Sequence, residues 1–144
     1  MASGVFQKAE NAVSTGGGTI SAVLNGLIFG LVGAVGALLL ISIAAVFYDI
    51  PEQVMNVLII IISVVTLFLA GFIAAGKNGK NGLIVGILTG LLYTLIALIV
   101  GIIAYRTVSF TPELIADLAI GAAVGGLGGV AGINKAAGKK RRRK

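Results

Sequence analysis

The chain contains neither cysteine nor histidine, and it has few aromatic residues. Without cysteine it forms no disulfide bond and offers no thiolate nucleophile or thiolate zinc ligand, and without histidine it lacks the commonest general base. Tryptophan is also absent and aromatic residues make up 6% of the chain, so an aromatic belt at a membrane interface would be thin. These absences exclude thiol, zinc–thiolate and imidazole chemistry, and the sequence predicts no cofactor.

Charge is also scarce, since charged side chains make up 11% of the 144 residues and hydrophobic ones 58%. A soluble domain has roughly 25% charged residues. The mean hydropathy of this chain is +1.09, and so few charges cannot cover a surface that faces water. Disordered chains are poor in apolar residues, so disorder is excluded for most of the length. We therefore expect an integral membrane protein.

Four segments are long and apolar enough to cross the hydrocarbon core, which takes about 20 helical residues. Apolar residues run all round each segment, and none shows the alternation typical of membrane β-strands. Because the connections are short, consecutive spans are expected to be antiparallel neighbours. The sequence therefore predicts an all-α fold, an integral membrane four-helix bundle of two tandem transmembrane hairpins. The predicted spans are residues 22–47, 54–75, 83–104 and 114–133, within a membrane domain of residues 22–134.

The distribution of Lys and Arg predicts the orientation in the membrane. Ten of the eleven lie on the side of the two termini and the middle connection, and Arg106 lies on the other side. By the positive-inside rule, both termini of this multi-pass protein face the cytoplasm and the membrane is the cell membrane. Residues 1–21 are interpreted as a cytoplasmic tail with a short helix on the membrane surface, followed by a flexible hinge at residues 16–18.

Residues 135–144 form a polybasic cytoplasmic tail. Anionic lipid headgroups attract such a segment, so the bilayer itself is an expected partner. Nucleic-acid binding is not expected, because no aromatic residue is interleaved with these charges. The residues predicted to contact anionic lipid are Lys139, Lys140, Arg141, Arg142, Arg143 and Lys144.

Glycine is abundant, with 22 residues, and it recurs in the predicted spans at intervals of four. This spacing places small residues on one helix face and lets two backbones approach closely, which drives helix association in lipid. The glycines either pack the bundle internally or leave a stripe for a partner, and the span at 114–133 is the best candidate for such a stripe. A glycine-lined ion path is a third interpretation. The predicted packing residues are Gly26, Gly30, Gly71, Gly82, Gly86, Gly90, Gly121, Gly125, Gly129 and Gly132.

An internal repeat is visible, because NGLIFG at residues 25–30 returns as NGLIVG at residues 81–86. Two shorter echoes follow at larger offsets, Pro-Glu at 51 and 112 and Ala-Ala-Gly-Lys at 74 and 136. Both halves begin and end on the same side of the membrane, so a duplication would give parallel repeats. Chance similarity between glycine-rich helices is the alternative.

Asp117 is the only ionisable residue inside the limits of a predicted span, and it lies one helical turn after Glu113. The two carboxylates are interpreted either as a cation or proton site, with Arg106 as counter-ion, or as acids in the headgroup region near a helix start. Hydroxyl side chains at depth are expected to bond backbone carbonyls or a neighbouring helix. The sequence shows no nucleophile–base pair and no metal-ligand set, which argues against an enzyme.

We therefore expect a non-enzymatic membrane protein that serves as a helix-packing accessory or scaffold subunit of a membrane complex. Its expected partners are other membrane proteins or a second copy of itself. The alternative is a small oligomeric transporter or channel that uses Asp117 and the intramembrane hydroxyls. Four spans with almost no buried charge favour the first hypothesis.

Gly71-Phe72 and Gly76-Lys77 precede the run LTGLLYTL at residues 88–95, and Gly125-Gly126 and Gly132-Ile133-Asn134 follow near the end. These motifs resemble a small four-helix integral membrane protein family of Gram-positive, often spore-forming bacteria. The similarity covers about residues 22–135, and the two tails depart from the shorter members. The resemblance implies the fold and a membrane location, and it implies no catalytic residue.

Overall fold

The computed structural model describes residues 2–106 and 112–142, and this part of the chain forms four α-helices without strands. Each helix is long and apolar enough to cross a membrane. The predicted all-α fold with four candidate spans is confirmed. The helices are α1 at Ala2–Phe47, α2 at Glu52–Asn78, α3 at Gly82–Tyr105 and α4 at Pro112–Arg142.

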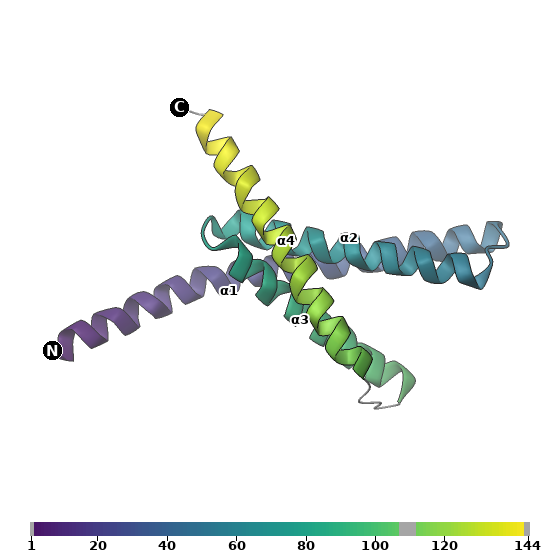
Figure 1. Cartoon of the computed structure of the whole chain (residues 1–144), viewed down its shortest axis with the longest axis horizontal. Helices are drawn as coiled ribbons and strands as arrows, with labels where there is room; N and C mark the ends of the chain where they lie inside the picture. The colour runs from purple at the N-terminus through teal and green to yellow at the C-terminus, as the bar shows by residue number, and fades with distance from the viewer. Residues whose placement is uncertain (1, 107–111, 143–144) are drawn as a thin grey trace.

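The helices form two antiparallel hairpins, α1–α2 and α3–α4, which cross each other (Figure 1). Helix α2 packs on the three other helices, and α4 packs on α2 and α3. Within the described residues α1 and α4 are not in contact, so the bundle is not closed on all sides. Away from the crossing the hairpins diverge, which leaves the molecule closely packed at its centre and open towards the hairpin ends (Figure 1).

Helix α1 is much longer than the predicted span, because it begins at Ala2 and continues through Gly16–Gly18. The hinge predicted at these glycines is therefore wrong. Each glycine in a helix costs about 1 kcal/mol relative to alanine, and three of them do not end a helix that continues on both sides. The first part of α1 projects away from the crossing (Figure 1). Its placement on a membrane surface stays a prediction.

Helix α4 also passes the predicted end of its span and reaches Arg142, so most of the polybasic tail is helical. Lys139, Lys140, Arg141 and Arg142 occupy its last turn. Basic residues are favourable there, because the carboxyl end of a helix carries negative partial charge. Arg143 and Lys144 lie outside the described residues.

A tight turn joins α2 to α3 and fixes where the second hairpin starts. Gly79 has a φ of 71°, and its N–H donates to the Ala75 carbonyl at 3.0 Å. This left-handed cap ends α2 in the way that glycine favours. Asn81 is also left-handed, with a φ of 50°, and the Asn78 side-chain amide donates to the Lys80 carbonyl at 2.8 Å.

Small residues dominate the buried core. Ala70, Ala74 and Ala75 are fully buried, and the largest side chains buried to that degree are those of Val85 and Thr89. Most of the large apolar side chains point outward instead. Lipid tails solvate such side chains as well as a protein interior does, so the core is left to residues that let helix backbones approach.

Candidate functional site

Glycines bring the backbones of α3 and α4 close together. A Cβ at Gly125 would lie 2.8 Å from the Gly90 Cα and 3.0 Å from the Gly90 nitrogen. Backbone lies on both sides of this contact, so no side chain could move aside to make room. We call this set of contacts the α3–α4 glycine contact. Its members are Gly82, Gly86 and Gly90 on α3 and Gly121, Gly125 and Gly129 on α4.

A second face of α4 packs on α2. Gly128 faces the carbonyl oxygen of Phe68, and Gly132 faces that of Phe72. Gly71 of α2 in turn faces the carbonyl oxygen of Gly125. The glycines of α4 cover more than one face because this helix has two close neighbours. Of the interpretations given for this span, internal packing therefore describes these glycines, which lie against α2 and α3.

The contact between α1 and α2 uses alanine against glycine. A Cβ at Gly30 would lie 2.7 Å from the Ala70 Cβ, and one at Gly26 would lie 2.6 Å from the Ala74 Cβ. Here the neighbouring atoms include side-chain methyl groups rather than backbone alone. A hydrogen bond of 3.4 Å from the Thr19 hydroxyl to the Asn78 side-chain oxygen also joins α1 to the end of α2.

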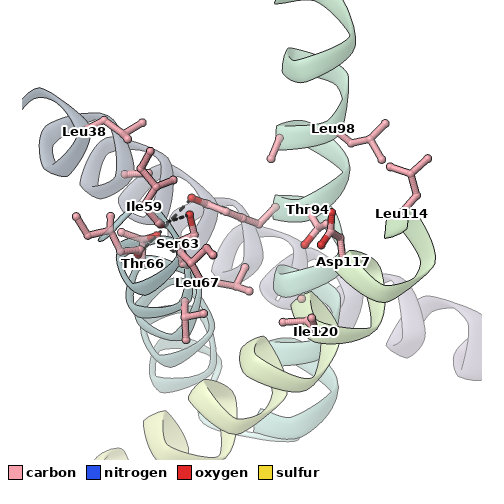
Figure 2. Close-up of a pocket in the computed structure, with 17 residues that line it drawn as sticks. Leu38, Ile59, Ser63, Thr66, Leu67, Thr94, Leu98, Leu114, Asp117 and Ile120 are labelled. Carbon is pink, nitrogen blue, oxygen red and sulfur yellow. Dashed lines mark hydrogen bonds between the residues drawn. The ribbon is translucent and has the colours of Figure 1, made fainter. Parts of the chain in front are cut away.

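Between the diverging hairpins lies a cleft of about 580 Å³ that all four helices line (Figure 2). Among the described lining residues, Asp117 is the one charged side chain. Most of the wall is apolar, with side chains such as Leu38, Ile59 and Leu98. The uncharged polar residues of the lining are Ser63, Thr66, Tyr93 and Thr94.

The hydroxyls of this cleft are held by their own helices. Ser63, Thr66 and Thr94 each donate to the carbonyl oxygen four residues earlier, at 2.8, 2.8 and 2.9 Å. The expected bonding of these hydroxyls to backbone carbonyls is confirmed. The Tyr93 hydroxyl lies 3.4 Å from the Thr66 hydroxyl, which links α3 to α2. Because a hydroxyl has a single hydrogen, the oxygens of Ser63 and Thr94 remain as acceptors, and the Thr66 oxygen is the acceptor for Tyr93.

The structure separates the two carboxylates that the sequence grouped together. Asp117 lines the cleft, and Figure 2 shows its side chain projecting into the same part of the cleft as Thr94. Both carboxylates are exposed, but Glu113, one turn earlier, is not among the lining residues. Arg106, the expected counter-ion, caps α3 with a left-handed φ of 51° and does not line the cleft. Asp117 therefore stands alone as the acidic group of this cleft.

The sequence does not reveal the cleft itself. Thr66 and Tyr93 are 27 residues apart, and no spacing rule relates residues on different helices. Their meeting depends on how the two hairpins cross, which hydropathy does not encode. In the described part of the chain, no three His, Cys, Asp or Glu residues lie close enough to hold a metal ion.

Comparison with known proteins places the chain in a family. Residues 19–132 match the family described as "Protein of unknown function (DUF3792)". The chain is also 33% identical to the uncharacterized membrane protein YrzE of Bacillus subtilis, over 93% of this chain and 95% of that protein. No solved structure matches. The resemblance to a membrane protein family of Gram-positive bacteria is thereby confirmed, and the chain belongs to the DUF3792 family.

Proposed function

We propose that this protein is a non-enzymatic accessory subunit of a membrane complex, and that α1 binds a transmembrane helix of another membrane protein. The exposure of α1 is the observation that supports this role. Of the four candidate spans, that of α1 is the least buried by its neighbours. It packs on α2 and α3, and it does not contact the described part of α4.

One face of α1 offers a suitable surface. Val32, Leu39 and Ile43 are exposed there at helical spacing, and Gly36 lies among them. A Cβ at Gly36 would meet nothing within 4 Å, so the face has a notch between bulky side chains. Ridges of one helix pack into grooves of another, and small residues bring helices close in lipid. We call this surface, Val32, Val35, Gly36, Leu39 and Ile43, the outer face of α1.

Photocrosslinking in native membranes tests this role. Benzoylphenylalanine at Val32 or Leu39 is expected to yield a protein adduct of one fixed mass. Purification of the captured protein through an affinity tag should then recover the present protein with it. Ile103 of α3 is a matched control, because it is 72% exposed and lies outside the cleft. At Ile103 we expect lipid adducts alone. No protein adduct from the outer face of α1, or the same adducts from Ile103, would contradict the proposal.

Transport is a second candidate function, and the placement of Asp117 in the cleft favours it. Ionisable residues in membrane spans frequently mark ion or solute paths. In liposomes, Asp117→Asn is expected to abolish any cation or solute flux that the wild-type protein shows. Unchanged flux, or no flux from the wild-type protein, would exclude this candidate.

The basic end of α4 is proposed to bind anionic lipid. Each basic residue near an anionic surface contributes about 1 kcal/mol. Lys135 differs from the basic residues of the last turn. Its ammonium group lies 5.4 Å from the centre of the Phe72 ring and so contacts α2. Native mass spectrometry should show fewer retained phosphatidylglycerol molecules when the four basic residues at 139–142 are replaced by glutamine. Equal retention would contradict lipid binding at this end.

The proposed orientation, with both termini in the cytoplasm, is testable by labelling. The chain has no cysteine, so single cysteines need no altered background. A cysteine at Asp49 should react with an impermeant maleimide on intact cells, and one at Asn78 only after permeabilisation. Labelling of Asn78 from outside would reverse the orientation.

A further inference from the structure

We infer that the cleft at Asp117 binds a protonated organic amine with an apolar body. This inference goes beyond the accessory role. It shares its site with the second candidate function, transport. It does not require transport, because an amine can occupy the cleft without crossing the membrane. The charge of the cleft, the polarity of its hydroxyls and its size each support this ligand class.

The charge of the cleft selects a cation. Asp117 is the one charged group among the described lining residues, and no Lys or Arg stands beside it in the lining. The Asp117 carboxylate is exposed beside largely apolar walls, and a positive charge in the cleft would stabilise it. An anionic ligand would meet repulsion from the same group, so the cleft discriminates by the sign of charge.

The hydroxyls further select an N–H donor among cations. The hydrogens of Ser63, Thr66 and Thr94 are engaged by carbonyls of their own helices. The oxygens of Ser63 and Thr94, together with the Asp117 carboxylate, therefore remain as acceptors in the lining, while the Thr66 oxygen is paired with the Tyr93 hydroxyl. An ammonium group has N–H donors and no acceptor, and it matches this set. Hydrogen bonds in which both donor and acceptor are charged are the stronger ones, so the pair with Asp117 dominates.

The walls and the volume define the rest of the ligand. Apolar side chains such as Leu67, Leu98 and Ile120 would surround an alkyl or ring group. A volume of about 580 Å³ lies within the range of about 300–1,000 Å³ of small-molecule sites. One turn of helix occupies about 500 Å³, and a spanning helix has more than five turns. The cleft therefore suits a small amphiphilic amine better than a whole helix.

Binding can be measured on the full chain in phosphatidylcholine nanodiscs by equilibrium dialysis. Radiolabelled octylamine is the probe, because its amine is protonated at pH 7 like that of lysine. Octanol and octanoate supply the same apolar chain with a neutral and a negative head. Empty nanodiscs measure partition into lipid, which is subtracted. We expect saturable binding of octylammonium, and no saturable binding of octanol or octanoate.

Variants locate the site. Asp117→Asn is expected to weaken binding about tenfold or more, because it removes the charge and keeps the side-chain size. Thr94→Val is expected to weaken it about threefold through the loss of one neutral acceptor. Glu113→Gln is the matched control, since it removes a carboxylate one turn away that does not line the cleft. Its affinity should stay within about twofold of wild type.

Unchanged affinity in Asp117→Asn, or saturable binding of octanol at the level of octylammonium, would overturn the inference. Should Asp117→Asn fail to fold, Asp117→Glu keeps the charge and Thr94→Val still reports on the site. Absence of saturable octylammonium binding to the wild-type protein would also overturn it. This holds even if the cause is a lysine side chain of a partner helix that occupies the cleft. Binding without flux in liposomes would instead exclude transport and leave the inference standing.

Discussion

The two hairpins share a sequence motif but differ in how closely their helices meet. The NGLI motif places Gly26 in α1 and Gly82 in α3, and each glycine faces the next helix of its own hairpin. Gly26 meets the Ala70 carbonyl oxygen and Ala74, and Gly82 meets the Gly129 carbonyl oxygen and the Ile133 side chain. One turn later the two hairpins differ, because Gly30 meets the Ala70 methyl group, whereas Gly86 meets the backbone of Gly125 and Gly129.

Helices α1 and α4 each pack on two others, but the span of α1 is less buried than that of α4. Helix α4 packs on both α2 and α3, so it carries glycine on two faces. Helix α1 keeps one face against the other helices and leaves its outer face bare. The equivalent contacts of the NGLI motif favour a duplication. The Ala-Ala-Gly-Lys echo at residues 136–139 does not extend this equivalence. Gly26 contacts Ala74, but its counterpart Gly82 contacts Ile133 and not Ala136.

The largest effect is expected for Gly125→Leu, in the α3–α4 glycine contact. Its side chain would meet the backbone of Gly86 and Gly90, neither of which can move aside. We expect a loss of several kcal/mol, which is a large part of the usual net stability of about 5–15 kcal/mol. Unfolding in detergent, followed by circular dichroism, measures it. Wild-type stability would show that this contact is absent in the membrane.

A smaller loss, about 2–3 kcal/mol, is expected for Gly128→Ala, which tests the second face of α4. The added methyl group would meet the Phe68 carbonyl and push α4 away from α2. Gly126→Ala is the matched control on the same turn, because its methyl group would meet the Ile87 side chain, which can shift. Equal losses of stability in the two variants would contradict a second closely packed face on α4, and with it the contrast with α1.

Gly30→Ala in the first hairpin is expected to cost about 1–2 kcal/mol, because its methyl group would overlap the Ala70 methyl group. This clash can be removed, so the double variant Gly30→Ala with Ala70→Gly should recover at least half of the loss. No single change can rescue Gly125→Leu in this way, since its neighbours are already glycines. A failure of the rescue would mean that the first hairpin is also held by backbone contact.

The smallest effects are expected where a glycine has open space beside it. Gly36 in α1 and Gly101 in α3 have no atom within 4 Å of an added Cβ. Replacement of either by alanine should raise the free energy of unfolding slightly, by about 0.5–1 kcal/mol, because alanine has the higher helix propensity and meets no neighbour. In native membranes, Gly36→Leu should reduce the crosslink from the outer face of α1 and leave the purified protein stable. A destabilised purified protein would place Gly36 inside the bundle.

Hydropathy and spacing predicted much of the fold and less of the site. The four spans follow from apolar runs and short connections, and each of the ten glycines chosen by spacing has a close neighbour. The hinge at Gly16–Gly18 failed because helix propensity is a weak guide where neighbouring residues favour a helix. The cleft could not be predicted, because Thr66 lines the same cleft as Asp117 and Thr94 only through the crossing of the two hairpins.

Solid-state NMR in lipid bilayers tests the α3–α4 glycine contact most directly. With glycine labelled by ¹³C, the Gly90 and Gly125 Cα atoms should give a cross-peak, because a Cβ on Gly90 would lie 3.2 Å from the Gly125 Cα. Dilution with unlabelled protein should leave that peak at full intensity per labelled chain if the contact lies within one molecule. Its absence, or its loss on dilution, would contradict the account.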